Sequence, residues 1–174
     1  MAVAKGVASP VFVPPTVPEF YEITRSAYLA ARAEAARIAT GKRIKVRVEA
    51  LKPTHIGLTQ YKLPTGDQTF TLKTNTAIFP YGILNRDSSF DYMKWWEGNK
   101  TRYIGDWFTL PVYYFAEFKQ GAYKGNLENY AFRGDETFTF NCHSTTTPTP
   151  TTVDAWLLAF VVIPETMAET AVTQ

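Results

Sequence analysis

The chain has 174 residues, which suffices for one domain with a full hydrophobic core and is short for two. Its 18 Lys and Arg against 16 Asp and Glu give a formal net charge of +2 without a conspicuous basic run, which argues against binding to nucleic-acid backbones. Aromatic residues make up 15% of the chain and threonine recurs throughout, a composition that favours β-structure over a helical bundle.

Residues 1–17 contain three prolines among small and β-branched residues, which is typical of an extended arm. They lack the charged start and long apolar core of a secretory signal, so we expect cytoplasmic synthesis. Pro18 then opens a predicted helix over residues 18–40, before Gly41. This helix should pack flat against a sheet or another subunit, because its apolar face is mostly alanine: Phe20, Ile23, Ala27, Ala30 and Ile38.

After Gly41 the apolar period changes from about 3.6 to 2. Apolar and charged residues alternate over 43–51, which predicts a strand with one dry and one wet face that ends before Pro53. Residues 56–63 and 68–79 flank a Pro-Thr-Gly-Asp sequence and predict the two arms of a β-hairpin.

From Pro80 to Thr101 this alternation is lost. Pro80-Tyr81-Gly82 predicts a turn, and the serines at 88 and 89 predict the cap of a short helix over 90–97. The segment brings together Tyr92, Trp95 and Trp96. We interpret these aromatic residues either as a lid over one end of the core or as an exposed contact surface.

Further strands are predicted over 106–118, 127–132 and 136–142. A threonine- and proline-rich link over 145–152 then leads into Asp154–Pro164, where nine consecutive apolar residues are about half the length needed to cross a bilayer. A buried helix is the alternative, but the β-branched and aromatic residues predict a central strand that is buried on both faces. Residues 165–174 are predicted to form a loose C-terminal tail.

Seven or eight strands without interleaved helices exclude the βαβ architectures and leave a barrel or sandwich. We therefore predict a single, mainly all-β domain over residues 18–164, including the N-terminal helix. An eight-stranded jelly roll is the best fit to its size and strand spacing.

No motif in the sequence predicts an enzyme, a metal or a cofactor. There is no phosphate-binding loop, no metal-ligand spacing and no Gly-x-Ser-x-Gly elbow. Cys142 and His143 are adjacent in a predicted strand, so they should point to opposite faces and cannot act as nucleophile and base. His55 is interpreted as structural. Four carboxylates that could converge in space are interpreted as solvated charges: Asp106, Glu117, Glu128 and Asp135.

The single cysteine cannot form a disulfide within its own chain. Cys142 is therefore either a buried free thiol that packs as a small hydrophobe or a cross-link between two subunits.

Three functions remain open on these residues. The first is a structural subunit that assembles with copies of itself through its arm, its helix and its aromatic loop. The second is a carbohydrate-binding β-sandwich, because the faces of Trp95, Trp96, Trp107 and the Tyr113-Tyr114 pair can stack on sugar rings. The third is a sandwich hydrolase that uses Glu117 or Glu128.

The order of these elements resembles a viral capsid protein of the single jelly-roll type. The likeness rests on the Pro-rich arm, the helix that begins Pro18-Glu19-Phe20-Tyr21-Glu22 and the run from Asp154 to Pro164. In particular, the chain is similar to the smaller of the two major capsid proteins of tailless icosahedral Thermus phages that have an internal membrane.

The resemblance implies a virion protein without catalytic residues, made in the host cytoplasm. It would form homodimers and combine with a second, larger capsid protein in an icosahedral shell over a membrane. The arm and the helix would then form contacts between subunits or with the membrane. The residues expected at inter-subunit contacts are Cys142, Phe20, Ile23, Tyr92, Trp95 and Trp96. The chain lacks the Glu/Lys networks of many thermophile proteins, which departs from this pattern.

Overall fold

The computed structural model describes residues 17–97, 100–104, 113–114, 131–166 and 170–173. These residues form one α-helix, one short 3₁₀ helix and twelve strands, all of whose pairings are antiparallel. In chain order the elements are α1 (Val17–Lys42), β1 (Val46–Ala50), η1 (Pro53–Ile56), β2 (Leu63–Pro64), β3 (Gly66–Leu72), β4 (Ala77–Asn85), β5 (Phe90–Glu97), β6 (Lys100–Ile104), β7 (Tyr113–Tyr114), β8 (Phe132–Arg133), β9 (Thr137–Ser144), β10 (Thr152–Val153), β11 (Ala155–Pro164) and β12 (Val172–Thr173).

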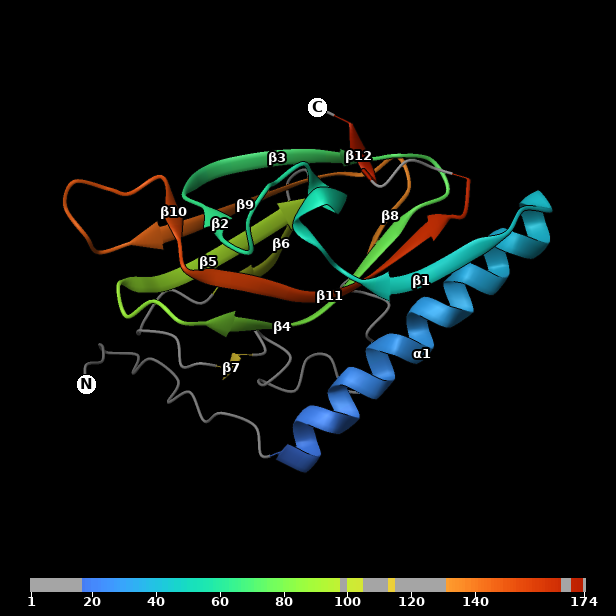
Figure 1. Ribbon diagram of the computed structural model, residues 1–174, viewed down its shortest axis with the longest axis horizontal. Coiled ribbons are helices and arrows are strands. Elements are labelled where there is room, and N and C mark those ends of the chain that lie inside the picture. Colours follow the sequence, from blue (N-terminus) through green and yellow to red (C-terminus); the bar gives the residue numbers. More distant parts are fainter. Residues whose placement is uncertain (1–16, 98–99, 105–112, 115–130, 167–169, 174) are drawn as a thin grey trace.

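The fold has three layers: helix α1 and two five-stranded sheets (Figure 1). The sheet next to the helix, called here the helix-side sheet, has the order β1-β11-β4-β7, with β8 also paired to β4. The second sheet, called here the outer sheet, has the order β12-β3-β9-β5-β6. A two-stranded ribbon of β2 and β10 lies at one end. The mainly β architecture with one N-terminal helix confirms the predicted fold class at that level.

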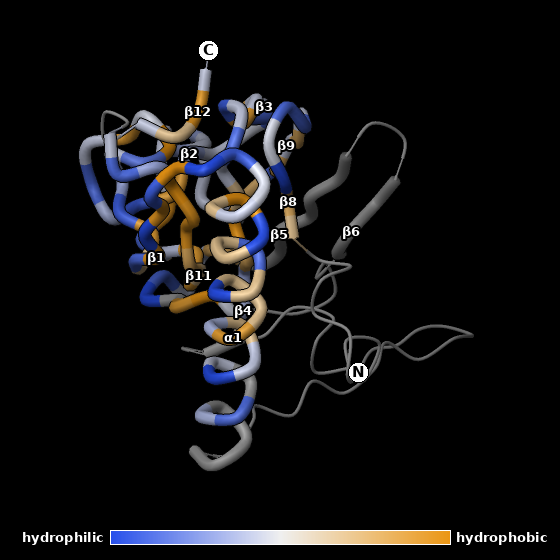
Figure 2. The backbone as a smooth tube through the Cα atoms, turned by 90° about the vertical axis from the view of Figure 1, so that its right-hand side faces the viewer, coloured by the Kyte–Doolittle hydropathy of each residue, from blue (hydrophilic) through white to orange (hydrophobic). Residues whose placement is uncertain are grey.

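Strand β11 is the central strand that its apolar run predicts. It pairs with β1 on one side and with β4 on the other. Alternate residues, such as Leu157 and Val161, enter the core between the two sheets, whereas Phe160 and Val162 pack toward α1. Figure 2 shows this apolar backbone in orange, between α1 and the outer sheet. Both faces of β11 are therefore covered, and the prediction is confirmed.

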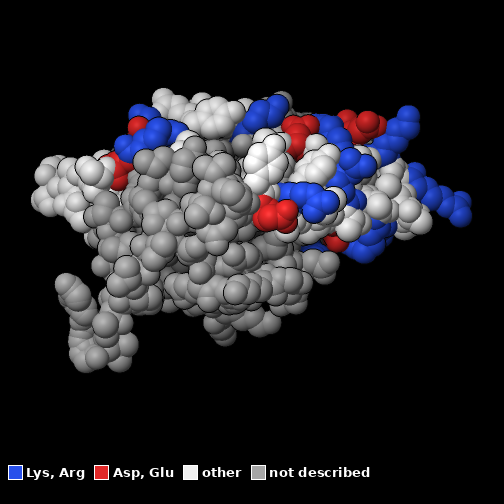
Figure 3. Space-filling view, turned by 90° about the horizontal axis from the view of Figure 1, so that it is seen from below, with Lys and Arg blue, Asp and Glu red and all other residues white. Residues whose placement is uncertain are grey.

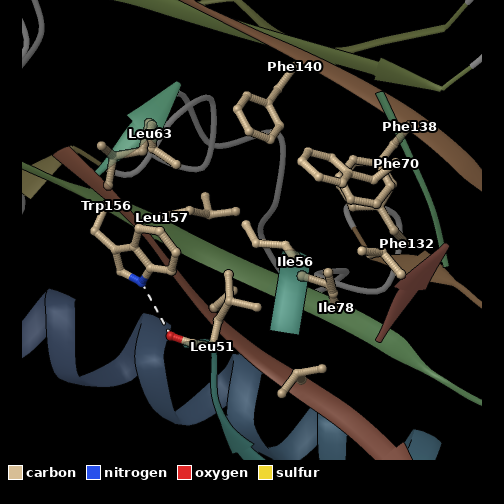
Figure 4. Close-up of a cluster of buried hydrophobic side chains, with 14 of the residues drawn as sticks. Leu51, Ile56, Leu63, Phe70, Ile78, Phe132, Phe138, Phe140, Trp156 and Leu157 are labelled. Atoms are coloured by element: carbon tan, nitrogen blue, oxygen red, sulfur yellow. Dashed lines mark hydrogen bonds between the residues drawn. The ribbon is translucent and has the colours of Figure 1, made fainter. Parts of the chain in front are cut away.

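The core between the sheets is built mainly from aromatic and branched side chains (Figure 4). Phe132 and Phe138 stack with ring centroids 4.4 Å apart, and Phe70 lies 5.6 Å from Phe140. The buried Trp156 donates its indole N–H to the carbonyl of Leu51 over 3.2 Å, which satisfies a polar group that burial would otherwise penalise.

Helix α1 packs closely on the helix-side sheet because its buried positions are small. Ala27, Ala31 and Ala35 recur every four residues, so they lie on one face, and Ile38 extends that face by one turn. The helix runs past the predicted end and includes Gly41. It stops at Arg43, which adopts a left-handed conformation with φ of 56°.

The predicted turn at Pro80-Tyr81-Gly82 is wrong, since these residues form a β-bulge within β4. Ala159 pairs with Pro80 and Leu158 with Gly82, so Tyr81 is the extra residue. The bulge reverses the alternation along the strand: Phe79 faces α1, whereas Ile83, four residues later, faces the core between the sheets. Pro80 lies next to this bulge, between the stretches of β4 that pair with β8 and β7, which is a position where proline is tolerated in a sheet.

Two further predictions before residue 101 are also wrong. Residues 90–97 form strand β5, which pairs with β9 and β6, rather than a capped helix. The predicted hairpin does not exist, because β2 pairs with β10 and β3 pairs with β9 and β12. The second predicted arm divides at Thr74-Asn75 into β3 and β4, which belong to different sheets.

The end of the described chain is attached to the fold, which corrects the prediction of a loose tail. Val172 and Thr173 form β12 on the edge of β3. Ala171 donates its N–H to the carbonyl of His55 over 2.8 Å and accepts a hydrogen bond from the N–H of Lys73 over 2.9 Å. The predicted arm over residues 1–17 lies outside the described residues except for Val17, which begins α1.

Candidate interaction surfaces

The predicted contact residues lie on two different layers of the fold. Phe20 and Ile23 belong to the first turns of α1. Tyr92, Trp95 and Trp96 belong to β5, where they pair in register with His143, Phe140 and Thr139 of β9. The side chains of these five predicted residues lie outside what the structure describes. Their backbone positions place the aromatic segment within the outer sheet rather than in a loop over one end of the core.

Cys142 is a free thiol in the core, with 1% of its surface exposed. Burial raises the pKa of this thiol well above its usual value, which keeps it protonated and unreactive. Its neighbour His143 is exposed, so the two side chains take opposite faces of β9 as the sequence predicts. The alternative role of Cys142, a cross-link between subunits, stays a prediction and would require the core face of β9 to open.

His55 is buried and takes part in a polar cluster with β1. Its Nδ1 accepts the backbone N–H of Lys52 over 2.9 Å, so the ring proton is assigned to Nε2, which lies 2.9 Å from Oε1 of Glu49. Burial acts to raise the pKa of Glu49, but hydrogen bonds from Arg47 and His55, together with the charge of Arg47, lower it on balance. The imidazole is fully buried and is held by these two contacts, which join η1 to β1.

Helix α1 carries three of the four exposed large hydrophobic side chains among the described residues: Tyr21, Tyr28 and Leu29. Tyr21 is 74% exposed and Leu29 is 49% exposed. Tyr28 is anchored at the flank of the helix, where its ring contacts Phe160 at 5.3 Å and its hydroxyl accepts a hydrogen bond from Arg32.

The exposed surface of α1 and of the turn after it is strongly basic. Six exposed cations follow the helix and the turn after it, at Arg25, Arg32, Arg37, Lys42, Arg43 and Lys45. Figure 3 shows Lys and Arg, in blue, gathered at the end of the molecule where α1 leads into β1. The net charge of +2, from which the sequence argues against binding to nucleic-acid backbones, therefore does not describe this surface. The local excess is visible in the sequence, because residues 21–52 contain eight basic and three acidic residues.

Glu34 fastens α1 to the helix-side sheet. Its carboxylate is buried and accepts hydrogen bonds from Arg37, one turn later, and it lies 3.5 Å from Nε of Arg133. The hydrogen bonds from Arg37 hold the pKa of Glu34 below its usual value even though burial acts in the opposite direction. A shallow pocket of about 270 Å³ lies beside this cluster and is lined by Ala30, Ala33, Glu34, Arg37 and Arg133.

A second polar cluster closes the corner between β4 and β5. Asp87 accepts hydrogen bonds from the N–H and hydroxyl of Ser89 and from the N–H of Asp154. These bonds lower the pKa of Asp87, with the Ser89 hydroxyl as the main cause. Ser89 also pairs with Ser144 over 2.9 Å, so the cluster ties the end of β9 to the start of β11. Its function is to hold the two sheets together at this end.

The solvent face of the outer sheet is polar over β3 and β9. Two pairs of threonine hydroxyls bridge the strands, Thr69 to Thr139 over 2.9 Å and Thr71 to Thr137 over 2.8 Å. Asn141 donates its side-chain N–H to Asp67 over 2.7 Å. These cross-strand pairs stabilise the sheet and leave a regular row of hydroxyl, amide and carboxylate groups on its surface.

Over the described ranges, no group of three or more His, Cys, Asp or Glu side chains is placed to hold a metal ion. Of the four carboxylates considered for hydrolysis, Asp135 is exposed and accepts a hydrogen bond from Thr74, whereas Asp106, Glu117 and Glu128 lie outside the described residues. Trp107 also lies outside them, and Tyr113-Tyr114 forms the short β7. The two described histidines do not meet, since His55 is buried near β1 and His143 is exposed on β9.

Comparison with known proteins found no matching family model, no similar curated protein and no similar solved structure. Among the described residues, no helix is both long and apolar enough to cross a membrane.

Proposed function

We propose that the chain is a single jelly roll built from eight of its strands. Taken in chain order, these are β1, β3, β4, β5, β6, β7, β9 and β11. The first pairs with the eighth, the second with the seventh, the third with the sixth and the fourth with the fifth. This is the pairing of one long antiparallel hairpin.

Two more pairings support the rolling of that hairpin into a closed sandwich. The eighth strand, β11, also pairs with the third, β4, and the seventh strand, β9, also pairs with the fourth, β5. Such pairings arise when a long hairpin wraps around a common core and produces two Greek keys, which is the arrangement of a jelly roll.

We infer from this strand order that the protein is a structural subunit of a virion capsid. The strand order is the single observation that carries the proposal. In this function the subunits associate as dimers and tile with a second, larger capsid protein in an icosahedral shell over an internal membrane. No chemistry is required of such a subunit, and many repeated contacts hold it in place although each contact is weak.

Within this proposal, two regions supply the contacts. The first turns of α1, with Phe20 and Ile23, and the aromatic strand β5, with Tyr92, Trp95 and Trp96, belong to different layers and so can serve different neighbours. In the described part of the chain, β1 is also the outermost strand of the helix-side sheet. An outermost strand offers backbone groups for pairing with another chain.

The test is quantitative mass spectrometry of particles from the source culture, separated on a density gradient. We expect the chain to sediment with particles in hundreds of copies, together with lipid and one other abundant protein. Absence of the chain from every particle fraction would overturn the capsid proposal. Deletion of residues 1–40 should abolish assembly, whereas a deletion variant that assembles normally would remove the arm and the helix from the contact surfaces.

A carbohydrate-binding function is the second candidate, and the outer sheet favours it. The polar row on β3 and β9 lies beside β5, in which Tyr92 and Trp96 pair in register with the exposed His143 and with Thr139 of that row, whereas Trp95 pairs with the buried Phe140. A sheet surface that carries both polar and aromatic groups can bind sugar rings, because a sugar ring presents hydroxyl groups and apolar faces. Titration with a panel of glycans should shift tryptophan fluorescence if this function is correct, and Asn141→Ala should weaken the response.

A further inference from the structure

Positively charged side chains are concentrated along the exposed surface of α1 and the turn after it, although the net charge of the whole chain is only +2. Six exposed cations lie between Arg25 and Lys45, and the exposed carboxylates beside them are Glu22 on α1 and Glu165, whose N–H donates to the carbonyl of Lys45. The remaining acidic residue of this stretch, Glu34, is buried and engaged by Arg37 and Arg133, so Arg37 is already paired. At 1.5 Å per residue, the helical part of this basic surface extends over about 25 Å.

An apolar stripe runs between these charges. Leu29, Ala33 and Ala36 follow one another at helical spacing on the side of α1 opposite the buried alanines, and all three are exposed. Tyr21, the most exposed large hydrophobic side chain among the described residues, lies two turns before Leu29. The outward side of the helix is therefore amphipathic too, because positively charged residues lie on either side of this narrow apolar stripe.

We propose that this face of α1 docks on the surface of a lipid bilayer that contains anionic headgroups. The helix already lies flat against the helix-side sheet, so its outer face can lie parallel to a membrane surface without unfolding (Figure 1). The arginines and lysines then meet the headgroup phosphates, while Leu29 and Tyr21 enter the boundary between headgroups and acyl chains. This combination of groups is what interfacial helices use.

Charge complementarity argues against two other binding partners for this face of α1. A second copy of the same face would bring like charges together, with Glu22 and Glu165 as the exposed carboxylates that offset them. A nucleic acid would match the cations but would leave the apolar stripe over a polar phosphate backbone. A bilayer suits both features, because its anionic headgroups can pair with the cations and its acyl boundary can take up the apolar stripe. The inference deepens the proposed function and rests on it for the presence of a membrane, but vesicle binding can be measured apart from capsid assembly.

The experiment is co-flotation of the full chain with vesicles of phosphatidylcholine alone and of phosphatidylcholine mixed with phosphatidylglycerol. We expect binding to the mixed vesicles that declines as salt is added, because screening weakens the attraction to the headgroups. Each basic residue near an anionic membrane strengthens binding roughly fivefold. Arg25→Gln combined with Arg32→Gln should therefore weaken binding on the order of thirtyfold.

The matched control removes two positive charges elsewhere, by Lys62→Gln combined with Lys73→Gln. It should change binding less than about twofold, since neither lysine belongs to the α1 face and their distant charges are screened. Leu29→Gln should reduce the binding that persists at high salt, and Ala36→Gln, on the same stripe, controls for added polarity at a small side chain. Circular dichroism of each variant checks that the fold is retained.

Three results would overturn the inference. Equal binding to neutral and anionic vesicles would remove the role of charge, and equal loss in the two double variants would remove the role of this face. Tighter binding to duplex DNA or to polyglutamate than to vesicles, without an effect of Leu29→Gln, would assign the surface to a nucleic acid or an acidic protein. Binding of the chain to vesicles, combined with its absence from particles, would support this inference and contradict the capsid proposal.

Discussion

The carboxylate of Glu34 on α1 lies 3.5 Å from Nε of Arg133 on β8, so a salt bridge joins the helix to the helix-side sheet. Arg37 donates two further hydrogen bonds to the same carboxylate from one turn along the helix. The carboxylate is buried while the guanidinium of Arg37 is largely exposed, and the hydrogen bonds outweigh the cost of burying the charge. Helix docking therefore depends on the ionised state of Glu34.

Acid should weaken this attachment. The pKa of Glu34 in the folded protein is below its usual value of 4.5, so the stabilisation is complete above that value and is lost as the pH falls through the lowered pKa. Glu34→Gln should reduce the free energy of unfolding by about 1–3 kcal/mol at pH 7. The deficit should shrink as the pH falls below about 4.5, where Glu34 of the unfolded wild type binds a proton, and should vanish once the folded carboxyl is protonated too.

Urea denaturation of both proteins at several pH values measures this difference. Glu22→Gln is the control, because it removes an exposed carboxylate from the same helix. A deficit for Glu34→Gln that is equally large at pH 3 and pH 7 would show that the side chain acts through packing rather than through its charge.

Two Gly→Ala substitutions should change stability in opposite directions. Gly41 lies inside α1, and a Cβ atom at this position would meet nothing within 4 Å. Gly41→Ala should therefore stabilise the protein by about 0.5–1 kcal/mol, since glycine is a poor helix former. A Cβ atom on Gly134 would lie 2.9 Å from the backbone N of Asn75 and 3.1 Å from the carbonyl O of Lys73.

Gly134→Ala should accordingly destabilise the protein by about 1–3 kcal/mol, because backbone on the β3–β4 turn would have to move. Thermal melting of the two variants compares them directly. A lower melting temperature for Gly41→Ala would mean that the last turn of α1 does not form in solution.

The contact between α1 and the helix-side sheet should be intolerant of larger side chains. Ala31 is fully buried at this contact, whereas Ala33, two residues later, is exposed. Ala31→Leu should destabilise the protein by about 1–3 kcal/mol through overpacking. Ala33→Leu should leave the stability within about 0.5 kcal/mol of the wild type. Chemical denaturation measures both, and similar effects of the two variants would contradict the observed orientation of the helix.

Sequence patterns predict elements whose environment is uniform along their length. The apolar run of β11 is continuous because both of its faces are covered, and alternation of phenylalanine with polar residues identifies β9 because only one face of the outer sheet is buried. The alanine-rich helix is identified for the same reason. In each case, one local period describes the whole element.

Patterns fail where the environment changes within an element or where pairing is distant. The bulge at Tyr81 reverses the alternation of β4, so the strand loses its period and Pro80 suggests a turn. The pairing of β2 with β10 joins residues that are almost ninety positions apart, and local turn chemistry carries no information about it. The net charge of the whole chain likewise does not reveal the basic surface of α1, because acidic residues elsewhere in the sequence compensate for it.

Cys142 should remain unmodified until the protein unfolds. Its thiol is buried and its raised pKa keeps it protonated, so a thiol reagent should react at the rate of global or local opening rather than at the rate of a free cysteine. The control combines Cys142→Ala with His143→Cys, which moves the thiol to an exposed position on the same strand and should react immediately. On a gel without reductant, the wild type should migrate as a monomer and this control should form dimers upon oxidation. Rapid labelling of native Cys142, or a wild-type dimer that reductant dissociates, would instead support the inter-subunit cross-link and would require β9 to open its core face.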